Sequence, residues 1–289
     1  YCVRLSDELF SHYVSDIIRK TSPDKVSVET IFLVSYIEQY INIVNDIEIV
    51  FHNIESLFFK ELFKSSNQIY KKIFYFIESK KINSLEKIIS TQINNKNSLF
   101  PVFLSEVDAS YYKDTFNFNN NKLRINSNKI YLEKTVKHHP NFKNPYFLFP
   151  GSVDFPPNKE AMLWLLDEYV KQFEDPFTIV ITGKITKTLK KEFLKYKCIR
   201  FSGFVSNEEL IKYYGSCICV ISPIISGGGV KVKNIEAISL LIPILMTEFS
   251  AIGIDSKNNA LVKVCKNDPN IFSTNLRHFC REIEKVFLC

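Results

Sequence analysis

A cluster of small and charged residues in the last quarter of the chain has the types needed to bind an anion. The segment ISGGGVKVKNIEA, residues 225–237, contains Gly227, Gly228, Gly229, Lys231, Lys233 and Glu236. Glycines leave backbone N–H groups accessible, a helix that begins beside them adds a partial positive charge, and lysines add full charges. The spacing is neither that of a P-loop nor that of a GxGxxG dinucleotide site. The segment predicts an anion site for a nucleotide phosphate; the alternative is a tight turn with solvated lysines.

The glycines are distributed unevenly along the chain. All eight lie at or after Gly151, and the first 150 residues contain none. Gly151, Gly183 and Gly203 each end a predicted strand, and the cluster at 227–229 follows another. Since ligands of parallel sheets bind outside the carboxyl ends of the strands, these glycines are expected at one functional edge.

The second half of the chain alternates strand and helix patterns. The predicted strands span 146–151, 177–183, 198–203, 217–223, 242–247 and 260–264. The predicted helices span 158–173, 187–196, 206–215, 231–240 and 270–287. Asn158 opens the first of these helices, and Ser206 with Glu209 forms a capping box for the third. This alternation predicts a parallel sheet covered on both faces, which is a Rossmann-like α/β domain.

The first half is also α/β but less regular. The predicted strands span 25–29, 47–52 and 100–105. The predicted helices span 34–43, 56–64, 66–90 and 106–116, followed by a loop over 117–122. Near the start, Leu5, Leu9, Tyr13, Ile17 and Ile18 form a helical stripe. The break in periodicity near Asn144-Pro145 divides the chain into domains 1–145 and 146–289.

Charge and cysteine content narrow the class of protein. The net charge of +6 comes from short lysine pairs beside acidic or apolar residues, which is typical of solvated helix faces rather than of a nucleic-acid-binding tail. The seven cysteines include no CxxC pair, so a reduced cytoplasmic setting is expected, with Cys217 and Cys219 as buried strand residues. No apolar run approaches the roughly 20 residues that span a bilayer. Peripheral attachment to the inner membrane face stays open.

The order of segments over residues 146–255 resembles the donor-binding domain of group 1 (family 4) glycosyltransferases of the GT-B fold. The motifs that carry the resemblance are Gly-Phe-Val at 203–205, Gly-x-Lys-x-Lys-x-x-Glu-Ala at 229–237 and the Ile-Pro strand at 242–247. Residues 51–56 and 103–113 are similar, more weakly, to parts of the family's acceptor domain. The resemblance implies two Rossmann-like domains, an acceptor-side domain over 1–145 and a donor domain over 146–289. The family's Gly-rich loop is not seen in the first half, so a partial acceptor domain is expected.

The resemblance also implies roles for individual residues. Glu236 would accept hydrogen bonds from the donor ribose, Lys231 would stabilise the diphosphate, and His52 would approach the donor sugar. The remaining binding residues would line the cleft or read the base edge: Gly151, Ser152, Gly183, Lys184, Gly203, Phe204, Val205, Gly227, Gly228, Gly229 and Lys233. The sequence departs from the family at Gly228, where many members have a second glutamate, and it lacks the Pro-Asn-Gly segment before the linker.

The implied function is transfer of a hexose-type sugar from a nucleotide-sugar donor to a hydroxyl of a glycan, lipid-linked or protein acceptor. The family retains anomeric configuration and needs neither metal nor cofactor. Two other classes are considered: a non-catalytic nucleotide-sugar-binding or partner subunit, and a nucleic-acid-binding protein, which the charge pattern disfavours.

Simpler structural roles compete at several of these positions. Glu236 could pair with Lys233 on a solvated helix face, His52 could be a core residue, and Lys184 could be a surface residue. The adjacent His138 and His139 point apart in an extended segment with no third ligand nearby, so no metal site is predicted.

Overall fold

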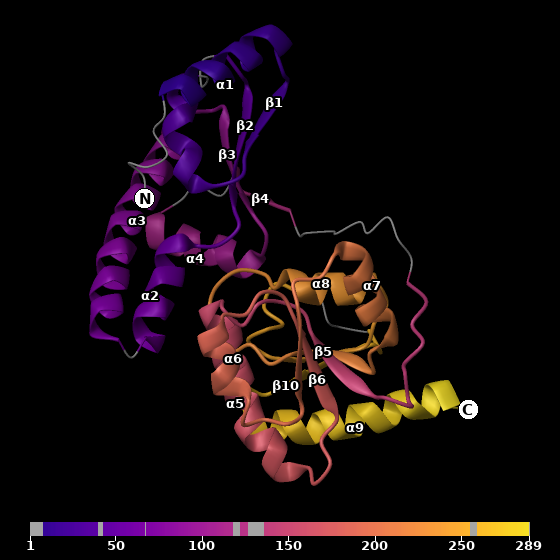
Figure 1. The fold of residues 1–289 in the computed structure, drawn as a ribbon. Helices are drawn as coiled ribbons and strands as arrows, with labels where there is room; N and C mark the ends of the chain where they lie inside the picture. Colours follow the sequence, from indigo (N-terminus) through magenta and orange to yellow (C-terminus); the bar gives the residue numbers. More distant parts are fainter. Residues whose placement is uncertain are drawn as a thin grey trace. The chain divides into compact units, whose positions relative to one another are not determined.

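The computed structural model describes residues 8–39, 43–66, 68–117, 122–126, 136–254 and 259–288. Contacts divide the chain into two compact units, one of residues 1–128 with 228–230 and one of residues 129–227 with 231–289. Each unit contains its own all-parallel sheet (Figure 1). The predicted α/β class with two Rossmann-like domains is therefore confirmed. Residues 136–145 are grouped with the second unit, and the domain boundary near Asn144-Pro145 stays a prediction.

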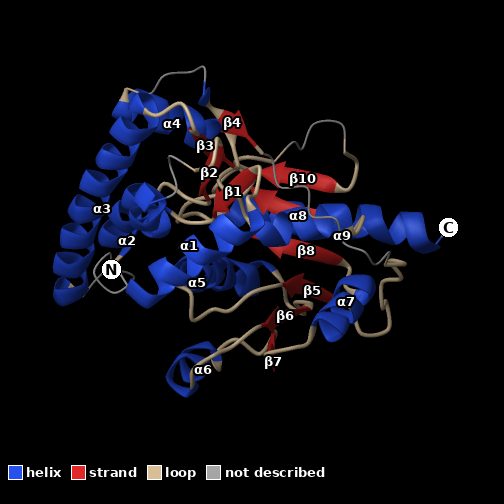
Figure 2. Cartoon of the chain, turned by 90° about the horizontal axis from the view of Figure 1, so that it is seen from above, coloured by secondary structure: helices blue, strands red, loops and turns tan. Residues whose placement is uncertain are grey.

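The sheet of the second unit has the strand order β10-β9-β8-β5-β6-β7. Its strands are β5 Tyr146–Phe149, β6 Thr178–Thr182, β7 Ile199–Gly203, β8 Cys219–Ser222, β9 Ile244–Thr247 and β10 Val262–Cys265. Figure 2 shows β10, β8, β5, β6 and β7 in that order across the sheet. This is the order of doubly wound nucleotide-binding domains, in which the direction of winding reverses beside the first strand. The reversal falls between β5 and β8, and it marks their carboxyl ends as the expected ligand position.

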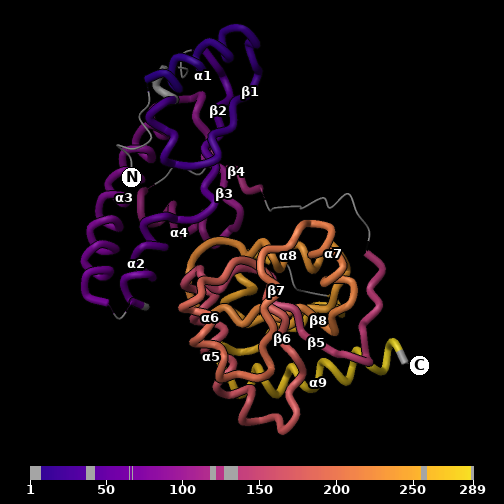
Figure 3. Tube along the Cα trace, in the orientation of Figure 1, coloured from indigo at the N-terminus to yellow at the C-terminus, as the bar shows by residue number. Residues whose placement is uncertain are grey.

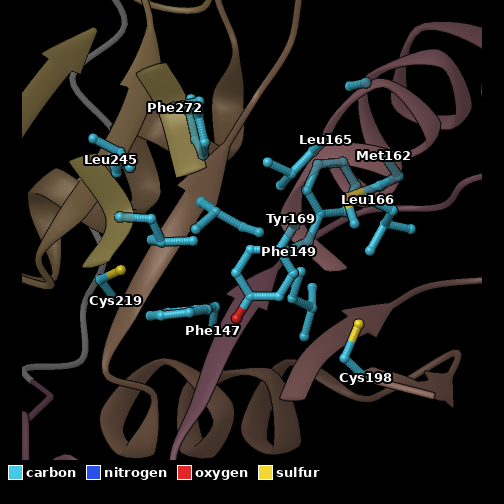
Figure 4. Packing of buried hydrophobic residues seen from close by; sticks show 14 of the residues in the cluster. Phe147, Phe149, Met162, Leu165, Leu166, Tyr169, Cys198, Cys219, Leu245 and Phe272 are labelled. Carbon is cyan, nitrogen blue, oxygen red and sulfur yellow. The ribbon is translucent and has the colours of Figure 1, made fainter. Parts of the chain in front are cut away.

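Alternate residues of these strands feed two different cores. One face of the sheet gives Phe147, Phe149, Ile179, Ile181 and Leu245 to a cluster with residues of α5 and α9 (Figure 4). The other face gives Leu148, Val180, Val220, Ile244 and Met246 to a cluster with Tyr214 and Ala237. Because both faces are covered, most strand residues are apolar, as in other buried parallel sheets.

Helices of the second unit follow the predicted pattern with small shifts. They are α5 Pro156–Gln172, α6 Lys187–Phe193, α7 Asn207–Ser216, α8 Val232–Ser239 and α9 Pro269–Leu288. The predicted capping box is confirmed, since Ser206 Oγ accepts from the Glu209 backbone and Glu209 reaches back to Ser206. The prediction that Asn158 opens α5 is wrong. The helix begins at Pro156, because the fixed φ of proline suits the first helical position and leaves no N–H unsatisfied there.

The first unit contains a four-stranded parallel sheet of order β1-β2-β3-β4. Its strands are β1 Lys25–Val28, β2 Asp46–Phe51, β3 Leu99–Phe103 and β4 Arg124–Ile125. Its helices are α1 Glu8–Thr21, η2 Ile31–Gln39, α2 Glu55–Ser65, α3 Ile69–Asn95 and α4 Glu106–Phe116. Figure 3 shows α2 and α3 side by side as a helical hairpin. Strands β2 and β3 pack on α3 and α4 through residues such as Phe51, Phe103, Ile89 and Tyr112.

Two predictions for the first unit needed correction. The helix predicted over 34–43 is a 3-10 helix over Ile31–Gln39, and residues 40–42 lie outside the described residues. Strand β4 was not predicted, because two residues are too short for a periodic signal. Leu5 of the predicted stripe and residues 118–121 of the predicted loop also lie outside the described residues.

Two further predictions from the sequence concern the cysteines and helices that could span a membrane. Cys217 and Cys219 are fully buried free thiols, as predicted, although Cys217 precedes the strand rather than lying in it. Among the described residues, no helix is both long and apolar enough to cross a membrane.

Candidate functional site

The turns after β5 and β6 pack backbone against backbone at the carboxyl edge of the second sheet. Gly183 has φ +101, and a Cβ there would lie 2.8 Å from the backbone N of Ser152, which is closer than real Cβ atoms approach. Gly151 has φ +128, and its N–H donates to Thr182 Oγ1 at 3.3 Å. Only glycine fits the turn at Gly183 without strain, so this part of the edge is built from exposed backbone.

The turn after β7 is joined to the same edge. The Gly183 N–H donates to the Gly203 carbonyl at 2.8 Å, and Ser152 Oγ donates to the Lys184 carbonyl at 2.5 Å. Phe204, which follows β7, is 78% exposed, and the Lys184 ammonium lies 6.0 Å from the centre of its ring. Six of the predicted binding residues, Lys184 among them, therefore lie together along the ends of three neighbouring strands. Lys184 is exposed, as the surface alternative expects, and its ammonium lies beside the Phe204 ring.

Helix α8 begins at this edge with its N-terminus uncapped by a side chain. Lys231 is the N-cap residue and offers no capping oxygen, so no side chain of α8 satisfies the first N–H groups. The Lys231 ammonium lies 5.0 Å from the ring centre of Phe249, which follows β9. Gly227 ends the loop after β8 with φ +97; Gly228 and Gly229 are grouped with the first unit, and the chain returns to the second unit at Lys231. A helix dipole and a lysine thus add positive charge beside the ends of β8 and β9.

Lys233 connects α8 to the turn after β5. Its ammonium donates to Asn158 Oδ1 at 3.0 Å and lies 3.9 Å from the ring centre of Phe149. Asn158 in turn donates from Nδ2 to the Ser152 carbonyl at 2.8 Å. Burial, together with the nearby Lys231 charge, lowers the pKa of Lys233 to about 7. The reversal point between β5 and β8 therefore contains a cation that an incoming anion would stabilise.

Glu236 lies one turn further along α8 and is half-buried. One of its oxygens, Oε2, accepts a hydrogen bond from the Tyr214 hydroxyl at 2.9 Å. Burial raises the pKa of Tyr214, so this hydroxyl stays protonated and keeps donating. The alternative that Glu236 pairs with Lys233 is wrong, because no ion pair joins these two described side chains; Lys233 donates to Asn158 and Glu236 accepts from Tyr214. Since a carboxylate accepts through both oxygens, Glu236 has a further acceptor atom to offer.

A buried polar network that the sequence did not reveal fixes the start of α8. Asn234 donates from Nδ2 to Ser250 Oγ at 3.0 Å and to the Ser250 carbonyl at 2.8 Å. Ser250 Oγ lies 2.6 Å from Ser222 Oγ at the end of β8. Thr247 Oγ1 donates to the Ile224 carbonyl. These bonds tie α8 to the ends of β8 and β9, so the candidate site is positioned by buried polar contacts rather than by loops alone.

His52 and His138, the histidines singled out in the sequence, differ in exposure and in their partners. His52 lies in the first unit after β2, with its side chain 49% exposed and Nε2 3.2 Å from Glu29 Oε2, so it is not a core residue. His138 Nε2 contacts the Cys217 carbonyl at 2.8 Å, its ring packs on Phe287, and burial lowers its pKa. The described residues contain no group of three His, Cys, Asp or Glu side chains placed to bind a metal.

The sequence pattern missed Asn158, Tyr214 and Asn234. The sequence pattern predicts Asn158 only as the residue that opens a helix, and no local signal marks it as the partner of Lys233. Tyr214 and Asn234 look like ordinary helix residues, since their partners are 22 and 16 positions away.

A hollow of about 720 Å³ lies at the opposite, amino ends of β5, β6 and β7, away from the glycine turns.

Comparison with known proteins agrees with this arrangement. Residues 144–282 match the family model described as Glycosyl transferases group 1. A curated relative, an uncharacterized 44.6 kDa protein in the cps region of Klebsiella pneumoniae, is 27% identical over 249 residues, covering 80% of this chain and 59% of the relative. The chain therefore spans about three-fifths of the length of that relative.

Solved structures share the fold at low sequence identity. A glycosyltransferase from Rickettsia africae ESF-5 has a TM-score of 0.63 and 15% identity, over 96% of this chain and 74% of that one. Anabaena Alr3699/HepE in complex with UDP-glucose has a TM-score of 0.62 and 11% identity, over 96% of this chain and 76% of that one. The sequence match makes residues 144–282 similar to the glycosyl transferases group 1 family, and the strand order with the likeness to solved structures shows that the chain has the GT-B fold.

Proposed function

We propose that this chain is a glycosyltransferase that takes a sugar from a nucleotide-sugar donor and attaches it to a hydroxyl acceptor. The observation that carries the proposal is the gathering of Lys231, Lys233 and the uncapped start of α8 where the winding of the second sheet reverses. A nucleoside diphosphate is the ligand that such an edge suits best, because it needs positive charge and backbone N–H groups at its phosphates. The family match supports the same choice.

Each part of the donor has a proposed partner. The diphosphate would lie at the start of α8 beside Lys231 and Lys233, and the ribose hydroxyls would donate to Glu236. The base would lie against the turn formed by Gly203, Phe204 and Val205, where the exposed Phe204 ring offers a stacking surface. The turns at Gly151 and Gly183 would let the donor approach the backbone closely. His52, from the first unit, is proposed to act near the transferred sugar.

The proposed reaction follows from the charges. As the bond between the anomeric carbon and the phosphate oxygen breaks, negative charge grows on the departing diphosphate. Lys231 would stabilise that charge, and so would the N-terminus of α8, which makes a metal-independent reaction chemically reasonable. The acceptor hydroxyl forms the new bond to the anomeric carbon, and its proton passes to the departing phosphate oxygen. Retention of the anomeric configuration is proposed from the resemblance to family 4.

The acceptor and setting are proposed from context. The relative from Klebsiella pneumoniae is described as a protein in the cps region, which favours a role in surface polysaccharide or glycan synthesis. The acceptor would then be a growing glycan or a lipid-linked sugar, and the reaction would take place in the cytoplasm, where nucleotide sugars are made.

Thermal shift measurements with UDP-, GDP-, ADP- and CMP-sugars test donor binding. One donor is expected to raise the melting temperature, since ligand at about 100 times its Kd adds roughly 2.7 kcal/mol to stability. Glu236→Gln should lose most of the rise, whereas Glu174→Gln, an exposed position in the turn after α5, should keep it. A flat response of the wild type to every donor would exclude the proposed site.

A non-catalytic nucleotide-sugar-binding or partner subunit is the second candidate. It is favoured by Gly228, which occupies the position where many family members have a sugar-contacting glutamate. Release of nucleotide from the donor that gives the thermal shift separates the two candidates. Turnover with any hydroxyl acceptor, or slow hydrolysis by water, supports the enzyme, and binding without turnover supports the second candidate.

A further inference from the structure

Exposed apolar side chains gather near the tip of the helical hairpin formed by α2 and α3, whose course Figure 3 shows. Ile69, Tyr70 and Ile73 are 72%, 64% and 56% exposed. They form an apolar surface with four further exposed residues, and we call the whole set the hairpin patch: Phe63, Ile69, Tyr70, Ile73, Phe74, Phe76 and Ile77. Seven exposed large apolar side chains within fifteen residues are uncommon on soluble proteins and indicate an interaction surface.

The patch lies on the side of α3 that faces away from the core. Residues at 69, 73, 76 and 77 share one side of a helix with 3.6 residues per turn. The opposite side of α3 supplies Ile82, Ile89 and Ile93 to the core of the first unit. Phe63 and Phe76 join α2 to α3 through a ring contact of 5.9 Å, but the other patch residues of α3 lie opposite this core side, so their apolar character calls for a different explanation.

Positive charge surrounds the patch. Residues 56–81 contain six lysines and two glutamates, a net charge of +4 out of +6 for the whole chain. Three of the lysines lie over patch rings: Lys71 over Tyr70 at 6.0 Å, Lys72 over Phe63 at 5.7 Å and Lys80 over Phe76 at 5.7 Å. Long basic side chains that follow aromatic rings present their charges beside the apolar surface.

We propose that the hairpin patch binds the surface of a lipid bilayer that contains anionic lipids. Apolar and aromatic side chains would enter the boundary between head groups and acyl chains, and the lysines would contact lipid phosphates. A protein partner is less well matched, because interface cores are depleted in lysine whereas anionic membranes attract it. The inference does not depend on the donor site, since the patch residues and the glycine turns lie in different units.

Vesicle cosedimentation of the whole chain tests this proposal. The wild type should bind vesicles of phosphatidylcholine with phosphatidylglycerol far better than phosphatidylcholine alone, and added salt should weaken the binding. Ile69→Gln with Ile73→Gln should lower the partition coefficient at least about tenfold, because two apolar side chains no longer enter the bilayer. Lys71→Gln with Lys72→Gln should lower it by about thirtyfold at low salt.

Ile88→Gln is the matched control, because Ile88 is 57% exposed on the same helix but lies beyond the patch. It should bind vesicles like the wild type. Equal binding of the wild type to both vesicle types, or wild-type binding by both double variants, would overturn the proposal. So would a dimer in sedimentation velocity that only the Ile69→Gln, Ile73→Gln variant abolishes, since the patch would then join two copies. Circular dichroism spectra and melting temperatures equal to those of the wild type show that both double variants fold.

Discussion

Each unit contains one ionisable side chain that burial moves to a pKa of about 7: Glu86 in the first and Lys233 in the second. Glu86 is fully buried in α3, where Oε1 accepts from the Ser56 backbone N–H at 3.2 Å. Its other oxygen, Oε2, has no hydrogen-bond partner among the described residues. Both groups are therefore about half ionised near pH 7, and in each the charged form is disfavoured by its surroundings.

The two regions differ in whether a ligand could reach the side chain with the shifted pKa. Glu86 is enclosed by the core of the first unit, with Tyr112 bonded to its backbone carbonyl. Lys233 lies beside turns that expose backbone, one side chain away from Lys231 and from the uncapped start of α8. A perturbed pKa alone therefore does not identify a functional site. The surrounding backbone and the access of a ligand decide whether a shifted group is structural or ready for chemistry.

The largest expected effect concerns the cation beside Lys233. Lys231→Met should lower kcat/KM for sugar transfer by about a hundredfold, because a charge that stabilises the departing diphosphate is lost. Lys231→Arg should restore part of the activity, and Lys187→Met, an exposed lysine of α6, should leave it unchanged. Steady-state kinetics with the donor found by thermal shift measure the effect. Unchanged kcat/KM in Lys231→Met would remove the contrast between the two regions.

The next largest expected effect concerns Glu86, the buried side chain of the first unit. The pKa of Glu86 is raised from 4.5 to about 7 in the folded state, so the folded state holds the extra proton between these pH values. The contribution of Glu86 to the free energy of unfolding is therefore highest below pH 4.5. It falls as the pH rises toward 7, by up to roughly 3 kcal/mol. Glu86→Gln should be more stable than the wild type by about 1–2 kcal/mol at pH 8 and nearly equal to it at pH 5.

Urea unfolding followed by circular dichroism measures the change in the first unit. Trp164, the single tryptophan, lies in α5 and reports separately on the second unit, whose transition should not move. Glu106→Gln, an exposed residue of α4, provides the control. If Glu86→Gln is destabilising at both pH values, the hydrogen bond to Ser56 outweighs the cost of the buried charge.

The two regions also differ in how far the sequence predicted them. In the second unit, continuous apolar strands, glycines at their ends and the capping box at Ser206 all point to the same fold, so the sheet and the positions of Gly151, Gly183 and Gly203 could be predicted. In the first unit the stripe of Leu9, Tyr13 and Ile17 predicted helix α1, yet these residues are exposed and Ile18 is buried. Periodicity identifies a helix, but its buried side depends on neighbours.

The residues that position the site were harder to foresee for a related reason. Asn158 and Asn234 work through partners 75 and 16 positions away, and no local pattern records such contacts. The lowered pKa of Lys233 likewise depends on its burial in the folded chain and on the nearby charge of Lys231. Glycines and charges along the sequence identify the edge of the sheet, whereas the polar contacts that fix its geometry follow only from the fold.

The smallest expected effect is a proton taken up by Lys233 when the donor binds. At pH 8 a lysine with a pKa of about 7 is mostly neutral, and a diphosphate beside it would raise that pKa again. Binding should then take up roughly half to one proton, so calorimetric enthalpies in phosphate and Tris buffers should differ in proportion. Lys233→Met should bind with the same enthalpy in both buffers, and Lys187→Met should behave like the wild type. Because no ligand reaches Glu86, the Glu86→Gln variant should keep the full buffer dependence of the binding enthalpy. Loss of that dependence in Glu86→Gln would show that the two regions are coupled. A binding enthalpy of the wild type that is the same in both buffers would place the diphosphate away from Lys233.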